Sequence, residues 1–162
     1  MPPEDVEPLT LAYCYLNRRE RTVAEVRAHL ESRGLGAGAT EPVLAELMAQ
    51  GYLDDQRFAR LFAQDKRELQ HWGEERIRRG LEARGIEPEL AAAAAREKGE
   101  GPTESDQALE LLRRRIPHPE RGRRQRERAL GLLLRRGYEY EVADAAIRAH
   151  LGGAEAVDEP VA

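Results

Sequence analysis

The amino-acid sequence predicts an all-α protein made of three tandem repeats of a three-helix motif. Composition is the first reason. Ala, Leu, Glu and Arg favour helices and supply 91 of the 162 residues, whereas Val, Ile and Thr supply 15. β-Sandwiches, barrels and doubly wound sheets contain more β-branched residues than this. An internal repeat is the second reason, and the helical spacing of apolar residues before each copy of that repeat is the third.

A triplet of arginine, glycine and an apolar residue occurs three times. The copies are Arg33-Gly34-Leu35, Arg84-Gly85-Ile86 and Arg136-Gly137-Tyr138, and their glycines are 51 and 52 residues apart. A glycine directly after the last helical turn is a common stop signal. A fixed period with matching positions indicates repeated units that bury their apolar faces against their neighbours. Because such units contact mainly the next one along the chain, we expect an elongated, curved molecule.

The first repeat covers residues 9–53 and follows a flexible tail at residues 1–8. Its three helices are expected from Leu9 to about Arg19, from a capping box of Thr22 and Glu25 to Arg33, and from Thr40-Glu41-Pro42 to Gly51. Residues 35–40, between the second and third helices, are predicted to form a flexible loop.

The second repeat covers residues 54–101. Asp54 is expected to cap its first helix, Trp72-Gly73 to precede its second, and Pro88 to begin an alanine-rich third helix that packs thinly. Gly99 to Pro102 resembles a hinge between this repeat and the next.

The third repeat covers residues 102–151. Thr103 or Ser105 is expected to cap its first helix, and Pro117 and Pro119 to end it. An arginine-rich helix follows, and the last helix runs from Tyr140 to Leu151. Residues 152–162 are expected to form a flexible tail.

Neither a membrane span nor a secretion signal is expected. The longest apolar runs are six residues, Leu11–Leu16 and Leu90–Ala95, whereas a span needs about 20 and a signal-peptide core about 7. The single cysteine, Cys14, cannot form an internal disulfide, and we expect a small buried thiol there rather than a nucleophile. These observations predict a cytoplasmic protein.

Positive charge is concentrated in one stretch, although the whole chain carries a net charge of −4. Residues 113–136 hold ten arginines against Glu120 and Glu127, a local charge of +8. Neighbouring like charges repel, and an ordinary solvated surface would interleave acids among them. We therefore predict a surface that binds nucleic-acid phosphates or an acidic protein. The candidate contacts are Arg113, Arg114, Arg115, Arg121, Arg123, Arg124, Arg126 and Arg128.

Five further arginines are candidates to extend this surface, with solvated or locally paired side chains as the alternative. They are Arg18, Arg19, Arg21, Arg76 and Arg79. Because no Phe, Tyr or Trp interrupts residues 113–136, bases would find no stacking platform there. Contact with single- or double-stranded DNA should therefore be independent of sequence and strongly dependent on salt.

The sequence holds no recognisable catalytic, cofactor or metal pattern. Its four histidines, His29, His71, His118 and His150, lie far apart in the chain, and no glycine-rich phosphate loop occurs. Adjacent acids such as Asp54 and Asp55 point about 100° apart on a helix and do not form an acid–base pair. We expect a protein that is not an enzyme and carries no cofactor or metal. Trp72 is expected to pack rather than to anchor a partner.

Several of these motifs resemble those of the RecX family of recombination regulators. They are Gly51-Tyr52-Leu53-Asp54-Asp55-Gln56-Arg57-Phe58-Ala59, then Trp72-Gly73 with Arg76-Ile77, and the arginine–glycine triplets at Arg84 and Arg136. The resemblance covers about residues 9–151, and the family fold is likewise three repeats of a three-helix motif. The first of these motifs also has a structural interpretation, in which Gly51 ends one helix, Asp54 caps the next and Arg57 pairs with a nearby acid.

The resemblance implies a partner that composition does not reveal, the RecA recombinase filament on DNA. Family members are not enzymes. They lie along the groove of that filament and inhibit its ATP hydrolysis, strand exchange and co-protease activity, which restrains recombination, DNA repair and the SOS response. We expect this chain to act in the same way, as a monomer.

Two other functions stay open at this point. A nucleic-acid-binding helical module without sequence preference would use the same +8 stretch. A helical-repeat adaptor for an unrelated protein would use the repeats themselves.

Overall fold

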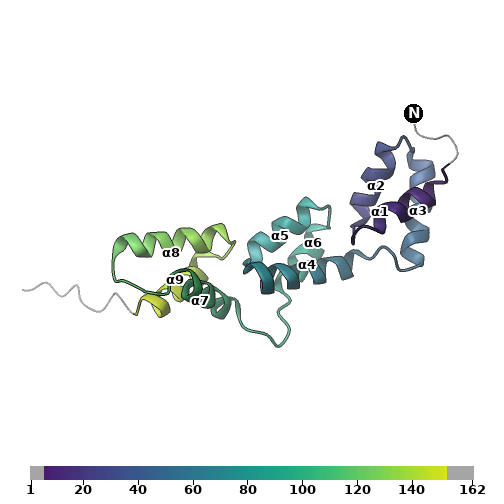
Figure 1. Cartoon of the computed structure of the whole chain (residues 1–162). Helices are drawn as coiled ribbons and strands as arrows, with labels where there is room; N and C mark the ends of the chain where they lie inside the picture. The colour runs from purple at the N-terminus through teal and green to yellow at the C-terminus, as the bar shows by residue number, and fades with distance from the viewer. Residues whose placement is uncertain (1–5, 153–162) are drawn as a thin grey trace, which may run out of the picture. The chain divides into compact units, whose positions relative to one another are not determined.

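The computed structural model describes residues 6–152, which form nine α-helices and no strand (Figure 1). The helices are α1 (Pro8–Leu16), α2 (Val23–Ser32), α3 (Ala37–Ala49), α4 (Asp55–Gln70), α5 (Glu74–Ala83), α6 (Pro88–Arg96), α7 (Glu104–Arg115), α8 (Arg123–Arg135) and α9 (Tyr140–Leu151). The all-α class and the three-helix repeat are confirmed, whereas the elongated, curved shape stays a prediction. The predicted tails lie largely outside the described residues, although α1 begins at Pro8, inside the first of them.

Contacts divide the chain into two compact units, and each unit takes part of the middle helix triplet. Unit 1 holds the described residues up to Phe62 together with Arg79–Ala94. Unit 2 holds Ala63–Arg78 together with the described residues from Ala95 onward. Helices α4, α5 and α6 therefore contribute residues to both units.

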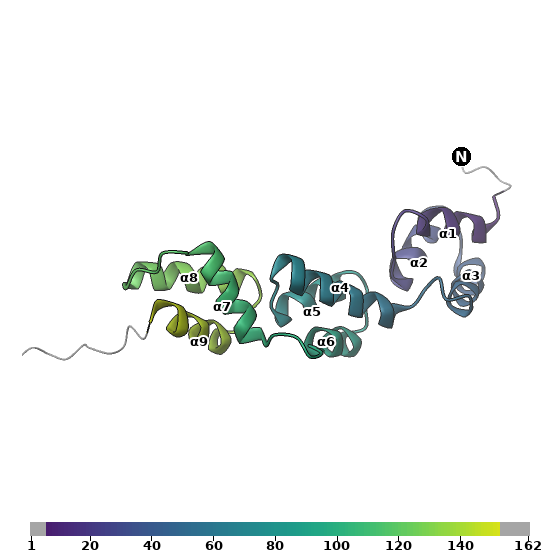
Figure 2. The ribbon, with the colours of Figure 1, turned by 60° about the horizontal axis from the view of Figure 1, so that its bottom comes forward.

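In unit 1, the first three helices enclose a small apolar core (Figure 2). Val26 and Leu30 of α2 and Leu44 and Leu47 of α3 are fully buried. The predicted capping box is confirmed: the Thr22 hydroxyl accepts from the Glu25 amide, and the Glu25 carboxylate accepts from the Thr22 amide. This box fixes the start of α2.

Three details of the first three-helix repeat differ from the sequence-based prediction. Helix α1 ends at Leu16 rather than near Arg19. Helix α3 begins at Ala37, so the predicted loop at residues 35–40 is wrong. Thr40 is fully buried inside that helix, and this packing outweighs the low helix propensity of Gly38 in the first turn. Cys14 is exposed rather than buried, because Ala12 occupies the core-facing side of α1.

We call a place where the turn of one three-helix repeat packs on the preceding repeat a joint. The first joint lies in unit 1, where the Arg84-Gly85-Ile86 turn packs on the start of α2. A Cβ atom added to Gly85 would lie 2.3 Å from the Ala24 Cβ, so only glycine fits. The Thr22 hydroxyl donates to the Arg84 carbonyl at 2.7 Å, and the Arg84 guanidinium lies 3.2 Å from the Glu25 carboxylate. Asp55, one residue after the predicted cap Asp54, accepts from the Val23 amide at 2.9 Å.

The second joint lies in unit 2, where the Arg136-Gly137-Tyr138 turn packs on the start of α5. The Gly73 amide donates to the Arg136 carbonyl at 2.7 Å. A Cβ atom added to Gly137 would lie 2.2 Å from the Arg76 Cβ and 2.5 Å from the Arg76 nitrogen. Gly34, the matching glycine of the first triplet, has nothing within 4 Å of that position. Two of the three periodic triplets found in the sequence are therefore joints.

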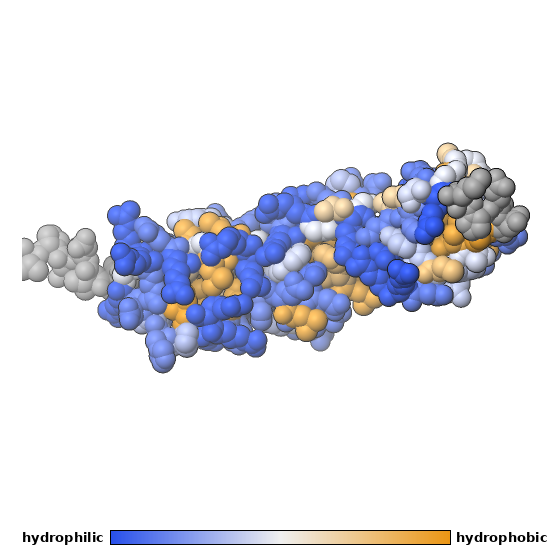
Figure 3. Space-filling view, turned by 45° about the horizontal axis from the view of Figure 1, so that its top comes forward, coloured by the Kyte–Doolittle hydropathy of each residue, from blue (hydrophilic) through white to orange (hydrophobic). Residues whose placement is uncertain are grey.

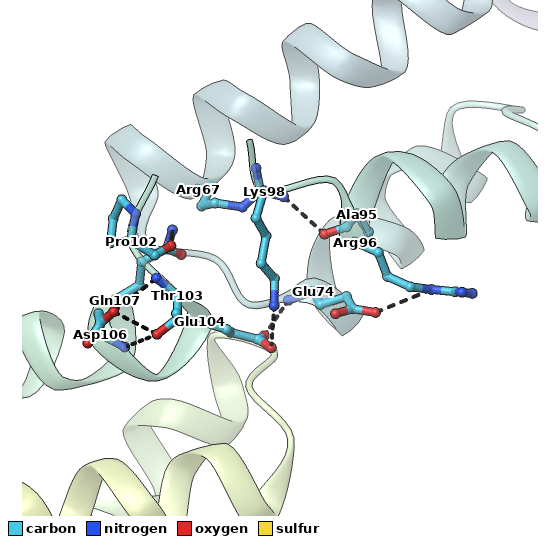
Figure 4. A network of polar contacts seen from close by, with 10 residues as sticks. All are labelled: Arg67, Glu74, Ala95, Arg96, Lys98, Pro102, Thr103, Glu104, Asp106 and Gln107. Carbon is cyan, nitrogen blue, oxygen red and sulfur yellow. Dashed lines mark hydrogen bonds and ion pairs between the residues drawn. The ribbon is translucent and has the colours of Figure 1, made fainter. Parts of the chain in front are cut away.

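Unit 2 also contains the core of α7, α8 and α9, in which Leu112, Leu133 and Ile147 are buried. Figure 4 shows the polar network that connects the segment before α7 to α5. The Glu104 carboxylate is nearly buried, accepts from the Glu74 amide at 2.8 Å and lies 3.7 Å from the Lys98 ammonium. Thr103, rather than Ser105, caps α7.

Candidate functional site

The eight candidate arginines between residues 113 and 128 all lie in unit 2, and we call them together the arginine surface. Arg113, Arg114 and Arg115 occupy the last turn of α7, Arg121 lies in the connection that follows, and Arg123, Arg124, Arg126 and Arg128 lie on α8. All of these side chains except Arg126 are exposed. Figure 3 shows this side of the third triplet as mainly hydrophilic, interrupted by apolar side chains. Ala129 and Leu133 form the buried face of α8, which directs the arginines outward.

Three of these eight arginines have acidic partners. Arg114 pairs with Glu110 at 3.0 Å and Arg123 with Glu127 at 2.8 Å, both one helical turn apart. Arg126 pairs with Asp144 of α9, and its side chain is only 34% exposed. Arg126 therefore connects α8 to α9 and contributes to the fold.

The other five arginines have no acidic partner within the described part of the chain. They are Arg113, Arg115, Arg121, Arg124 and Arg128. Guanidinium groups bind phosphate and carboxylate oxygens through paired hydrogen bonds. These five side chains are consequently the part of the surface that is free to bind an anionic partner.

Among the predicted extensions, only Arg76 shares unit 2 with this surface, and its guanidinium is used within the second joint. It lies 4.2 Å from the centre of the Trp72 ring and donates to the Arg135 carbonyl at 3.1 Å. Trp72 is partly buried, with the Lys66 ammonium 4.8 Å from its ring centre. The Trp72 ring thus packs inside the joint, with the cationic side chains of Arg76 and Lys66 next to it.

The remaining extensions belong to unit 1. Arg18 and Arg19 are exposed after α1, and Arg79 is exposed on α5. The Arg21 guanidinium lies 4.1 Å from the centre of the Tyr15 ring, which stacks on His29. Arg57 of the family motif lies 3.8 Å from Glu20, as the structural interpretation of that motif predicted.

Two residues that the sequence analysis did not propose as contacts lie close to Arg114 of the arginine surface. His71 follows α4 with a positive φ of 53°, and its Nε2 lies 3.5 Å from the Arg114 guanidinium. Arg136 donates to the Gln70 carbonyl beside it. Burial, followed by the charges of Arg114 and Arg136, lowers the pKa of His71. His71 and Arg114 are 43 positions apart in the sequence, so no local pattern indicates their proximity.

Residues 6–152 contain neither a cluster of metal ligands nor a helix that could span a membrane. No group of three or more His, Cys, Asp or Glu side chains there is arranged to hold a metal ion. No helix in the same range has the length and apolar character that crossing a bilayer requires.

Comparisons with known proteins consistently find one family. Residues 54–94 match the family model described as RecX, second three-helix domain. The regulatory protein RecX of Deinococcus radiodurans is 36% identical over 90% of this chain and 70% of its own length. That of Trichlorobacter lovleyi is 32% identical over 76% of this chain and 82% of its own length. The chain spans only 31% of the longer RecX of Lactobacillus delbrueckii.

Solved structures show the same fold. The crystal structure of RecX from Lactobacillus salivarius matches with a TM-score of 0.74, covering 88% of this chain and 94% of that one at 20% identity. A second crystal structure, of a regulatory protein RecX, matches with a TM-score of 0.67 over 88% of this chain and 70% of that one, at 21% identity.

Proposed function

The chain belongs to the RecX family of regulatory proteins, and we propose on this basis that it binds the RecA filament on DNA and inhibits it. The inhibited activities would be ATP hydrolysis, strand exchange and co-protease activity, so that the protein restrains recombination, DNA repair and the SOS response. The observation that carries this proposal is the identity of 36% with a regulatory protein RecX over 90% of the chain.

The exposed arginines supply a physical means of binding such a filament. A nucleoprotein filament presents DNA phosphates and acidic side chains, and both attract guanidinium groups. A helical-repeat protein held there would obstruct the path of a second DNA strand. It would also resist the movements between recombinase subunits that accompany ATP hydrolysis.

The proposal requires no chemistry from the protein itself. We propose a monomer that acts in the cytoplasm as a binding partner, without catalysis and without a cofactor. Its main contacts are proposed to be the five arginines for which the described residues provide no acidic partner, among them Arg124 and Arg128.

A second candidate function uses the same surface. A general nucleic-acid-binding module would contact the phosphates of bare DNA, with an affinity that falls steeply as salt rises. The exposed, unpaired arginines favour this alternative as much as the first proposal, so the two must be separated by experiment.

The deciding experiment titrates the protein into RecA already assembled on single-stranded DNA and follows ATP hydrolysis. Binding to the same DNA without RecA is measured in parallel. We expect inhibition at protein concentrations that leave bare DNA largely unbound. Firm binding to bare DNA with undiminished ATP hydrolysis would instead establish the general nucleic-acid module.

A further inference from the structure

A cluster of positive charge surrounds the second joint in unit 2. Its members, which we call the joint cluster, are His71, Arg114, Arg115 and Arg136. They come from three places in the chain: the end of α4, the last turn of α7 and the residue after α8. The Arg114 side chain is 62% exposed, so the cluster is open to solvent.

The joint cluster carries more positive charge than its acidic neighbours offset. The groups that act on His71 are the guanidiniums of Arg114, Arg115 and Arg136 and one carboxylate, Glu110, which pairs with Arg114. Their net charge is +2 while His71 is neutral. Like charges held together in a folded protein repel one another, and a bound anion relieves that repulsion.

A joint can form without this surplus of positive charge. At the matching place in the first joint, the Arg84 guanidinium pairs with the Glu25 carboxylate. In the second joint, the Arg136 guanidinium donates to the Gln70 carbonyl, which carries no net charge to offset its own, and no acidic side chain among residues 6–152 pairs with it. The second joint keeps the same turn but leaves its guanidinium charge uncompensated.

We propose that the joint cluster is a phosphate-binding site that takes a phosphodiester group of the DNA backbone. Guanidinium forks and an imidazole N–H supply several donors, which suit the oxygens of a phosphate. DNA as the source of the phosphate rests on the proposed function, in which the protein lies on a nucleoprotein filament. The cluster contacts the backbone and therefore selects no sequence.

Binding at this site is coupled to protonation of His71. A phosphodiester keeps its negative charge throughout the range in which histidine titrates, so the protein alone supplies any proton uptake. In the free protein, burial and the charges of Arg114, Arg136 and Arg115 oppose the imidazolium form, and Glu110 only partly offsets them. A bound phosphate favours that form and raises the pKa of His71. DNA should therefore bind more tightly as the pH falls, by about tenfold for each unit by which the pKa rises.

The test is an NMR titration of the full-length protein, in low salt, with and without a short oligothymidylate. The readout is the pKa of each histidine. We expect the pKa of His71 to lie below its ordinary value in the free protein and to rise by about one unit with the oligonucleotide. His71→Asn removes the proton coupling and keeps the positive φ, which asparagine tolerates. His118→Asn, in an exposed connection, is the matched control.

Substitutions in α7 test the charge contribution separately. Arg114→Gln should lower the slope of log affinity against log salt by about 0.7, as expected for one lost contact to single-stranded DNA. The control is Arg60→Gln, at an exposed position of α4 in unit 1, because Arg60 is not among the candidate contacts. We expect a smaller change in slope from that control.

Three results would overturn this inference. They are an oligonucleotide that binds without changing the pKa of His71, an oligonucleotide that does not bind at all, and polyglutamate that raises this pKa more than DNA does. Since RecA is absent from these measurements, they succeed or fail independently of the ATP hydrolysis experiment that tests the proposed function.

Discussion

The two joints share one backbone arrangement but differ in the partner of their arginine side chain. In each, a glycine turn packs on the start of a neighbouring helix, and the carbonyl of Arg84 or Arg136 accepts a hydrogen bond from that helix start. In the first joint the Arg84 guanidinium pairs with Glu25, whereas in the second the Arg136 guanidinium donates to a carbonyl and has no acidic partner in the described part of the chain. The repeat thus needs the glycine and the carbonyl. In our proposal, the surplus positive charge of the second joint binds an anion.

Replacing the joint glycine should have the largest effect. In Gly137→Ala the new Cβ would overlap the Arg76 backbone, which cannot move aside as a side-chain tip can, so we expect a loss of about 4 kcal/mol in the free energy of unfolding. In Gly34→Ala the new Cβ meets nothing and only the positive φ is unfavourable, so the expected loss is about 1–2 kcal/mol. Urea denaturation measures both, and equal losses would contradict the assignment of Gly137 to a joint.

Removing the cap at the first joint should have an intermediate effect. Thr22 is fully buried and its hydroxyl both caps α2 and donates to the Arg84 carbonyl. We expect Thr22→Ala to lose about 2–3 kcal/mol in the free energy of unfolding. Thr103→Ala is the matched control, because Thr103 caps α7 from an exposed position, and its expected loss is about 1 kcal/mol. If thermal or urea unfolding gives the reverse order, the bond across the joint contributes little.

The smallest effect on stability, and the sharpest contrast between the joints, comes from their arginines. Arg84→Gln removes a partly buried ion pair and should lose about 1 kcal/mol, with oligonucleotide binding unchanged. Arg136→Gln should lose at most about 0.5 kcal/mol, because glutamine can also donate to a carbonyl. It should nevertheless weaken oligonucleotide binding several-fold. Measuring both quantities on both variants tests the comparison, and matching behaviour of the two would refute it.

Much of the fold could be predicted from local signals. The spacing of the three arginine–glycine triplets indicated the repeat, and Thr22 with Glu25 marked the start of α2. These signals act within a few residues of one another, so the sequence displays them directly. The start of α3 was missed because burial of Thr40, a tertiary effect, outweighs the low helix propensity of Gly38.

The candidate site could be predicted only in part. A count of charges found the arginine stretch, but the role of each arginine depends on residues that are distant in sequence. Arg126 pairs with Asp144 on the next helix, and Arg114 meets His71 across 43 residues. No short-range pattern encodes either contact. For Cys14, the surrounding run of apolar residues did not indicate which side of α1 faces the core.

The most direct test of the account asks whether the exposed arginines of unit 2 contact the filament. It compares Arg124→Glu/Arg128→Glu with Arg33→Glu/Arg60→Glu, which changes net charge equally at exposed positions of unit 1. Circular dichroism would verify that helicity is unchanged, and inhibition of RecA-catalysed ATP hydrolysis on single-stranded DNA would be the readout. We predict at least about tenfold weaker inhibition for the first variant, equivalent to about 1.4 kcal/mol, and less than about twofold for the second. Equal potency of the two variants would contradict the account.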